Sequence, residues 1–383
     1  MHQTKKRKTS HDQKSSQNEL VETAAKPSAV FTPQGGRSYT LSVALPGSIV
    51  ANAKSHDQKT YLAGAIARAL AVFGVDEIVV FEDDEQRVDN YNPHDPNGTP
   101  DSPDGYTAFS DPSHFLSHIL SYLETPPHLR KYLFPMHPNL RTAGTLPSLD
   151  MPHHVRASEW GEYREGVVVG PDMQNGEYNN PQKKHKDSKK KKSGKNKDMG
   201  EEKEVLTTVN VGLPDLIHLP GISIPEHTRL TLKFRSSDPS DGADPVSPSA
   251  PREETGYYWG YSVRRCGSLS SVFTDSPFDG GYDLSIGMSE RGKPLPEVLE
   301  EQNIPRYKHL LLVFGGVGGI EAAVQADRSL ADKGVTPTDA DKLFDFWVNL
   351  LPGQGSRTIR TEEAVWLGLM GFRRVVDANS TTK

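Results

Sequence analysis

The first part of the chain alternates between runs typical of buried strands and a run with the apolar spacing of a helix. Tyr39–Leu45 alternates apolar and polar residues and is rich in strand formers, whereas Val75–Phe81 is continuously apolar, as buried parallel strands are. Between them, Ser55 is a suitable cap for a helix that continues to about Phe73. This order of strand, helix and strand predicts an α/β fold with a parallel sheet. The expected core face of the helix is Leu62, Ile66, Ala69 and Phe73.

A second helical stretch is expected at Phe109–Leu133, interrupted at Pro126-Pro127. The basic turn Arg141–Pro147 follows, and we assign 38–154 to the first half of the α/β domain. Several histidines in this region match no spacing of a metal-binding motif, so no metal site is expected. These are His128, His137, His153 and His154.

From about Val155 the pattern changes to short, irregularly spaced pieces typical of strands. Five such pieces predict a small β-barrel inserted at 155–275. The insertion contains a basic low-complexity loop at 182–203 and an acidic, Pro- and Ser-rich loop at 236–254, which we expect to be flexible. The five pieces are Tyr163–Val169, Val205–Val211, Ile217–Leu219, Arg229–Phe234 and Tyr257–Arg264.

Patterns typical of an α/β fold return after the insertion. Tyr282–Ile286 is strand-like and ends in a turn, Ser289-Glu290-Arg291-Gly292, and helical spacing follows at Leu295–Gln302. The α/β domain is therefore expected to be split. Its second half is predicted at 276–376, between the insertion and a short tail at 377–383.

Two further strand-like runs, Leu310–Phe314 and Phe344–Leu351, each lead into a glycine-rich turn and then into a helical stretch. Glycine tolerates positive φ and lets a ligand approach the backbone closely. In an open α/β sheet, ligands bind outside the carboxyl ends of the strands. Two such turns at neighbouring strand ends therefore predict a pocket lined by main-chain N–H and C=O groups.

Neither turn carries a nucleotide-binding signature. Gly315–Gly319 is not a Rossmann fingerprint, because Glu321 stands where that pattern needs glycine or alanine, and the chain has no phosphate-binding loop of the GxxxxGK[ST] type. The second turn, Pro352–Arg360, leads into a helix that Thr361 is expected to cap, with two glutamates in its first turn. Each turn alone is consistent with a connection that binds nothing, but the pair favours a site.

The loop GSRTIRTEEA, residues 355–364, resembles the signature loop of the SPOUT-class RNA methyltransferases, in particular of the bacterial enzymes that act on uridine N3 of ribosomal RNA. Other blocks resemble the archaeal and eukaryotic branch of this class, which includes a human centromere-associated member. They occur in the same order over roughly 38–376, outside the insertions. One departure is Thr358, where the uridine-N3 loop carries an aliphatic residue. The blocks are Tyr39–Ile49, Thr60–Ala69, Val75–Glu82 and Ser289–Gly292.

This resemblance implies both a fold and a reaction. The fold is a Rossmann-like parallel sheet whose C-terminal part is threaded as a trefoil knot, interrupted by a barrel of the OB type. The reaction is methyl transfer from S-adenosylmethionine to RNA, by a homodimer. We assign the donor contacts to Ser289, Phe314, Gly315, Gly316, Gly319, Leu350, Gly353, Gln354, Gly355, Thr358, Ile359 and Arg360.

Methylation of uridine N3 would leave negative charge on the base as its proton departs, and a nearby guanidinium would stabilise that charge. Arg291 and Arg360 are the catalytic candidates for this role, with Glu363 as a candidate for handling the proton. The alternative for Arg360 is an ion pair at the start of the helix. For Glu363 the alternative is ordinary N-terminal helix chemistry.

Composition narrows the class of protein. A chain of 383 residues is long enough for two domains, and its 34% apolar content and mean hydropathy of −0.60 reflect its polar segments. A single cysteine, Cys266, excludes a disulfide framework and points to a reducing compartment. No apolar run approaches membrane-spanning length. The net charge of −6 argues against a uniformly basic nucleic-acid binder.

Local basic clusters nevertheless point to RNA. Lys5–Lys8, in a polar segment 1–37 that we expect to be disordered, suits nuclear import or RNA contact and supports a nuclear or nucleolar location. OB folds bind single strands by aromatic stacking in basic grooves, although about half of the aromatic residues at 257–261 would belong to the barrel core. The expected RNA contacts are Arg141, Lys184, Lys190, Tyr258, Arg264 and Arg265.

The sequence therefore predicts an S-adenosylmethionine-dependent RNA methyltransferase that acts on uridine N3 of large-subunit ribosomal RNA. Two other classes stay open. One is a protein that keeps the fold but has lost turnover and serves as an RNA-binding factor in large-subunit assembly. The other is a structural scaffold for spindle or centromere proteins.

Overall fold

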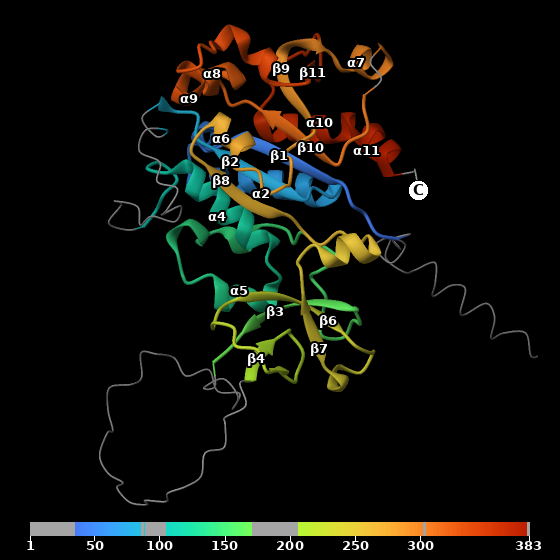
Figure 1. Cartoon of the computed structure of the whole chain (residues 1–383). Coiled ribbons are helices and arrows are strands. Elements are labelled where there is room, and N and C mark those ends of the chain that lie inside the picture. The colour runs from blue at the N-terminus through green and yellow to red at the C-terminus, as the bar shows by residue number, and fades with distance from the viewer. Residues whose placement is uncertain (1–34, 86–87, 89–104, 171–205, 302–303, 381–383) are drawn as a thin grey trace, which may run out of the picture.

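The computed structural model describes residues 35–85, 88, 105–170, 206–301 and 304–380 (Figure 1). Its larger sheet has six strands in the order β11-β9-β10-β1-β2-β8, and all neighbouring pairs are parallel. The predicted α/β class with a parallel sheet is confirmed. The strands are β1 (Thr40–Pro46), β2 (Glu77–Phe81), β8 (Ser262–Cys266), β9 (Leu284–Pro294), β10 (His309–Phe314) and β11 (Phe346–Asn349).

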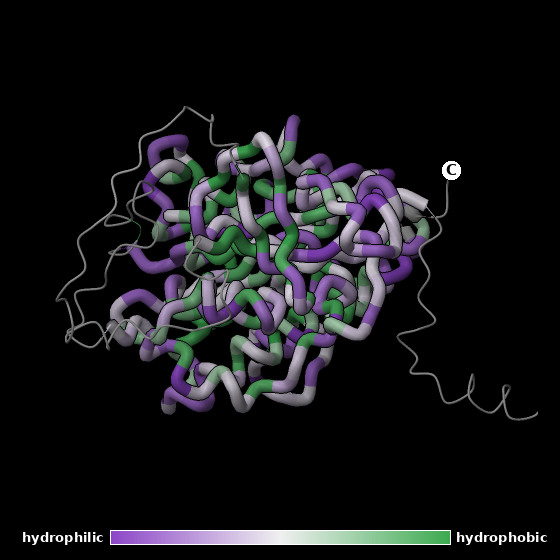
Figure 2. The backbone as a smooth tube through the Cα atoms, turned by 90° about the horizontal axis from the view of Figure 1, so that it is seen from below, coloured by the Kyte–Doolittle hydropathy of each residue, from purple (hydrophilic) through white to green (hydrophobic). Residues whose placement is uncertain are grey.

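Helices cover both faces of this sheet. Alternate residues of β10 separate the two cores: Leu310 and Leu312 join the core with α2, α4, α7 and α10, whereas Leu311 and Val313 join the core with α6, α8 and α9. Figure 2 shows the apolar segments gathered inside and the polar ones outside. The helices are α2 (His56–Phe73), α4 (Pro112–Glu124), α5 (Pro127–Leu133), α6 (Leu269–Thr274), α7 (Leu295–Glu301), α8 (Gly319–Ala326), α9 (Arg328–Ala331), α10 (Thr361–Gly371) and α11 (Arg373–Ser380).

Two of the predicted helices have the expected ends. The Ser55 hydroxyl accepts a hydrogen bond from the Gln58 N–H, so α2 is capped as predicted, and Gly74 ends it in the left-handed conformation. The proline pair that separates α4 from α5 interrupts the second helical stretch, also as predicted. Among the described residues, none of the helices combines the length and the apolar character needed to span a bilayer.

The smaller sheet is antiparallel and has five strands in the order β5-β4-β3-β6-β7. Its edge strands β5 and β7 lie close to each other, so the sheet is nearly closed around a core that includes Val209, Leu219 and Leu232. Four of the five predicted strands are present. The strands are β3 (Tyr163–Val168), β4 (Leu206–Asn210), β5 (Ile217–Pro220), β6 (Arg229–Phe234) and β7 (Ala243–Val246).

The fifth predicted strand of the insertion is wrong. Tyr257–Arg264 does not enter the small sheet, because β8 (Ser262–Cys266) pairs in parallel with β2 in the large one. The chain therefore returns to the α/β domain before the predicted boundary at 275. The fifth strand is instead β7, within the segment 236–254 that we expected to be a flexible loop. Pro245 and its acidic neighbour weaken the strand pattern there, and proline is tolerated because β7 is an edge strand.

Both predicted ends of the folded region need correction. Arg37, which we assigned to the disordered segment 1–37, forms an ion pair of 2.6 Å with Asp76, and both side chains are mostly buried. At the other end, α11 continues through Asn379, whose side-chain amide donates to the Tyr307 carbonyl at 2.9 Å. Residues 377–380 therefore belong to a helix and not to a tail. The loop 182–203 and Lys5–Lys8 lie outside the described residues.

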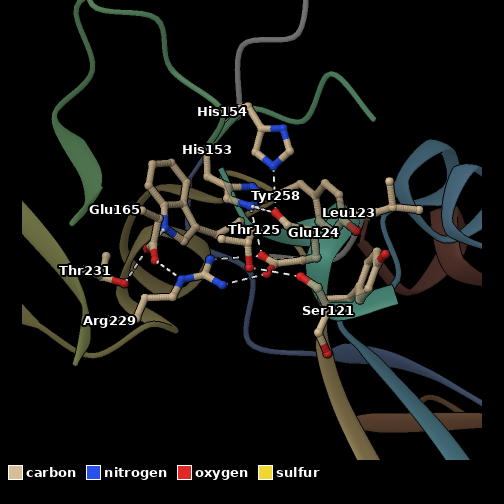
Figure 3. A network of polar contacts seen from close by, with 12 residues as sticks. Ser121, Leu123, Glu124, Thr125, His153, His154, Glu165, Arg229, Thr231 and Tyr258 are labelled. Carbon is tan, nitrogen blue, oxygen red and sulfur yellow. Dashed lines mark hydrogen bonds and ion pairs between the residues drawn. The ribbon is translucent and has the colours of Figure 1, made fainter. Parts of the chain in front are cut away.

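A buried polar network, which we call the Arg229 clamp, joins the small sheet to helix α4 of the larger domain (Figure 3). The Arg229 guanidinium on β6 donates to Glu124 at the end of α4, at 2.6 and 3.0 Å, and to Glu165 on β3, at 2.6 Å. Thr231 and Trp259 also donate to the Glu165 carboxylate, and His153 pairs with Glu124 at 2.9 Å. Burial would raise the pKa of Glu124, but Arg229 and His153 hold it at about 2.

Candidate active site

A cavity of about 570 Å³ opens at the carboxyl ends of β10 and β11, beside residues 288–291 in the middle of β9. Its volume is within the usual range of small-molecule sites, and its position is where open α/β sheets bind ligands. Three segments line most of it: Met288–Arg291, Phe314–Gly319 and Asn349–Thr361. The structure thus brings together the three glycine-containing segments that the sequence pointed to. Gly353 and Gly355 belong to the third segment but are not among the lining residues.

The first wall is the turn Gly315–Gly319, which leaves room for a ligand because it carries few side chains. Its fold is tight: the Gly319 N–H donates to the Gly316 carbonyl at 3.0 Å, and Gly319 has φ +74°. A Cβ atom on Gly315 would lie 2.6 Å from the backbone of Gly319 and Ile320. Glycine is therefore required at 315 by close backbone approach and at 319 by a conformation that other residues rarely adopt.

The second wall is the turn that ends at α10, and it differs from the prediction in one respect. Thr361 is the first residue of the helix and not its N-cap, and its hydroxyl donates to the Gly315 carbonyl at 3.1 Å. This bond joins the second wall to the first. The cap position is held by Arg360, whose N–H donates to the Glu363 carboxylate at 2.9 Å. Glu363 therefore makes the ordinary N-terminal helix contact that we considered as its alternative.

The third wall is a bulge inside β9, where we expected a turn at the end of a strand. Trp347 of β11 is opposite Gly287, but its neighbour Val348 is opposite Lys293, so the residues between loop outwards. The Asn349 side chain supports the bulge by donating to the Glu290 carbonyl at 2.8 Å. A Cβ atom on Gly292 would lie 2.5 Å from the Val348 backbone, so glycine lets β9 rejoin β11.

Charged side chains are unequally exposed around this cavity. Three arginines line it, Arg291, Arg357 and Arg360, and all three side chains are exposed. Glu321 on α8 also lines it but is only 15% exposed, and its carboxylate lies 3.4 Å from the guanidinium of Arg291, which is 71% exposed. The cavity therefore combines a basic rim with one largely buried carboxylate.

Sequence reasoning missed several polar and charged residues of the lining, among them Asn52, Glu321, Asn349 and Arg357. In the sequence, Glu321 was noted only because it stands where a Rossmann fingerprint needs glycine or alanine. Asn52 follows β1, in the short helix η2 (Gly47–Asn52), more than 230 residues before the rest of the site. No local signal connects it to the cavity, because only the parallel pairing of β1 with β10 brings the two regions together.

Three of the predicted RNA contacts have structural partners in the larger domain. The Tyr258 hydroxyl donates to the Val75 carbonyl at 2.9 Å, and burial raises its pKa well above the usual value. Arg264 donates to Glu77 at 2.9 Å, and Arg265 pairs with Asp111 at 2.8 Å. These side chains pack between the large sheet and its neighbours and do not line a barrel groove as expected.

The other predicted RNA contacts lie elsewhere. Arg141 is exposed in the turn between the short helices η3 (Pro138–Leu140) and η4 (Ala143–Thr145). Lys184 and Lys190 lie outside the described residues. Within the described ranges, no group of three or more His, Cys, Asp or Glu residues is arranged to hold a metal ion.

Comparison with known proteins identifies the relatives of this chain. Residues 40–372 match the model of a family described as "Putative RNA methyltransferase". The chain belongs to this family. The match includes both sheets and all three walls of the cavity, and it confirms the family predicted from the sequence. As a member of this RNA methyltransferase family, the protein is a methyltransferase.

Several relatives carry more specific names. A human protein named 28S rRNA (uridine-N(3))-methyltransferase is 40% identical over 342 residues, which cover 88% of this chain and 79% of the human protein. A mouse protein of the same name is 41% identical over 338 residues, covering 88% of this chain and 77% of the mouse protein. A Drosophila melanogaster protein of that name is 38% identical over 337 residues, covering 87% of this chain and 62% of the fly protein.

Proposed function

We propose that this protein transfers a methyl group from S-adenosylmethionine to N3 of a uridine in large-subunit ribosomal RNA. The observation that carries the proposal is the cavity, in which the β9 bulge converges with the segments that follow β10 and β11. Relatives named for uridine-N3 methylation of 28S rRNA, at 38–41% identity, support the substrate and the position. The expected place of action is the nucleolus, where such RNA is made.

The lining residues suit the chemistry of the donor. Its adenine and amino-acid parts need hydrogen-bond donors and acceptors at close range, which the exposed backbone of the glycine turn and of the segment Leu350–Arg360 can provide. A cavity of about 570 Å³ has room for a molecule of this size. When bound, the donor supplies an already activated methyl group. The protein then has to align the acceptor and manage one proton.

Two arginines suit the needs of the acceptor base. Loss of the N3 proton leaves negative charge on the uracil ring, and preorganised cations near that charge lower the barrier. Arg291, on the β9 bulge, and Arg360, immediately before α10, line two different walls of the cavity. We propose that they flank the base. Because the Glu363 carboxylate accepts from the Arg360 N–H, we assign Glu363 to holding this arginine's backbone in place.

The finer features of the fold belong to the same proposal. We propose that the segment from β11 to α10 is threaded as a trefoil knot, and the bond from Thr361 to the Gly315 carbonyl supports it, because it holds this segment against the turn after β10. We further propose that β3 to β7 form an OB-like barrel. The nearly closed antiparallel sheet is consistent with that architecture.

A homodimer is also part of the proposal. On α10, Trp366, Leu367 and Met370 form an apolar stripe with exposed fractions of 37%, 39% and 65%. This stripe continues directly from the second wall of the cavity, so a second copy of the chain seated on it would lie beside the site. Sedimentation velocity tests the assignment: Met370→Glu should convert a dimer into a monomer, and a wild-type monomer at micromolar concentration would exclude it.

The reaction is tested with purified protein, labelled S-adenosylmethionine and large-subunit ribosomal RNA, followed by nuclease digestion and mass spectrometry of the nucleosides. We expect 3-methyluridine, and we expect Arg360→Ala to slow its formation by about 10²–10³-fold, the usual cost of removing a group that stabilises transition-state charge. Arg374→Ala, an exposed arginine on α11 outside the cavity, is the matched control. Donor binding without any transfer would instead indicate a protein that has lost turnover and acts in ribosome assembly.

A further inference from the structure

Glu321 has an unusual environment for a carboxylate at the start of a surface helix. It lies in the first turn of α8, yet it is only 15% exposed and lines the cavity. Its carboxylate folds back over the glycine turn, so that a Cβ atom on Gly319 would clash with it. Among the lining residues that the structure describes, Glu290 is the other carboxylate, and its side chain is exposed on the β9 bulge.

The neighbouring arginine does not account for this placement. Arg291 is 71% exposed, and an ion pair of 3.4 Å with so exposed a partner contributes little in water. A helix N-terminus favours negative charge, but it does so equally for a carboxylate that points into solvent. Partial burial of a carboxylate carries a cost unless a cation compensates it. The cavity side of Glu321 therefore suits a positively charged ligand.

We propose that Glu321 makes the cavity select the methyl donor, whose sulfur is a positively charged sulfonium, over the product, whose sulfur is neutral. The inference rests on the proposed function. S-adenosylmethionine and S-adenosylhomocysteine share their adenosine and amino-acid parts, and they differ by one methyl group and one positive charge on sulfur. Contacts to the shared parts therefore cancel in the ratio of their affinities, and only groups near the sulfur change that ratio. A carboxylate that favours the sulfonium also speeds product release, because the attraction disappears when the methyl group leaves.

Isothermal titration calorimetry of the full chain with both ligands tests the proposal. We expect Glu321→Gln to weaken S-adenosylmethionine binding roughly tenfold, as expected for a single partly screened charge, while binding of S-adenosylhomocysteine changes less than about twofold. Retained product binding also shows that the variant is folded and its cavity intact. Equal weakening of both ligands, or no change in either, overturns the proposal.

A third ligand separates charge from contact with the methyl group. Sinefungin carries an amine-bearing carbon in place of the sulfonium, so it has the positive charge without sulfur. Glu321→Gln should weaken sinefungin about as much as S-adenosylmethionine. If sinefungin instead behaves like S-adenosylhomocysteine, the carboxylate responds to the methyl group and not to the positive charge, and the proposal is wrong.

Two further variants complete the test. Arg291→Met removes the cation that partly neutralises Glu321, so it should shift the affinity ratio in the opposite direction, toward stronger preference for S-adenosylmethionine. Asp332→Asn removes one negative charge from an exposed site after α9, outside the cavity, and should leave the ratio unchanged. If wild-type protein binds none of the three ligands, the proposed donor fails together with this inference. If it binds all three with an unchanged ratio in Glu321→Gln, only the inference fails.

Discussion

The cavity and the Arg229 clamp are both made of polar groups from distant parts of the chain, but they are completed in different ways. In the clamp, one guanidinium serves two carboxylates, and Thr231, Trp259 and His153 occupy much of the remaining hydrogen-bonding capacity. In the cavity, glycine backbone and exposed arginines converge without filling the space between them. The comparison separates groups that hold the fold together from groups that are arranged for a ligand.

The largest effect is expected in the clamp. Arg229→Met leaves Glu124 and Glu165 without their shared cation, and removing one partner of a buried ion pair costs about 3–5 kcal/mol of unfolding free energy. Denaturant unfolding measures it. The matched control is Arg235→Met. Arg235 forms an ion pair with Asp244 in which both side chains are more than half exposed, so its loss should not measurably change the unfolding free energy. Similar losses in both variants would contradict the distinction.

A smaller effect, confined to binding, is expected from glycines of the cavity. Gly315→Ala places a Cβ atom 2.6 Å from backbone atoms of the same turn, so the wall must shift, and donor affinity should fall roughly tenfold. Gly355→Ala meets no atom within 4 Å and should leave the affinity almost unchanged. Calorimetry with S-adenosylmethionine measures both. If Gly355→Ala weakens donor binding more than Gly315→Ala does, the ligand contacts the turn around Gly355 and not the turn around Gly315.

The smallest effect concerns pH and again belongs to the clamp. Burial, followed by the neighbouring His153, lowers the pKa of His154 to about 3, and its Nε2–H donates to the Glu124 carbonyl. Below pH 6.5, the ordinary pKa of histidine, His154 binds a proton in the unfolded chain but stays neutral in the folded chain. The free energy of unfolding therefore falls as the pH drops.

Between pH 7 and 5.5 this residue should account for a loss of about 1 kcal/mol. His154→Gln keeps a hydrogen-bond donor but does not titrate. The unfolding free energy of this variant should therefore fall by about 1 kcal/mol less than that of the wild type between pH 7 and 5.5. Identical pH profiles of the two proteins would show that folding does not lower the pKa of His154.

The fold could be predicted where local sequence decides it. Ser55 with Gln58 caps α2, and the alternating pattern of β1 and the continuous apolar runs of β2 and β10 each predicted a strand that is present in the parallel sheet. Prediction failed where tertiary pairing overrides local pattern. The run of aromatic residues before Ser262 suggested a barrel strand, but β8 instead completes the edge of the large sheet, where Arg264 finds Glu77 on the adjacent β2.

The candidate site also has parts that could be predicted from local sequence and parts that could not. The glycine turns after β10 and β11 could be predicted, because glycine at strand ends has a local conformational reason. The bulge in β9 could not, since it exists only relative to the register of β11. Glu321 could not be assigned either, because its significance comes from burial against the turn and not from its spacing in the sequence.

The bond between Thr361 and the Gly315 carbonyl, which spans 46 positions of the chain, has a consequence for biosynthesis. Every element that contributes to the Arg229 clamp precedes Ser262, whereas nearly every wall residue of the cavity comes from the last hundred. A nascent chain can therefore bring the small sheet against α4 before it can recognise a donor. Ligand recognition becomes possible only when the C-terminal helices leave the ribosome, so a product truncated after β8 would retain the clamp residues but lack β9, β10, β11 and the cavity.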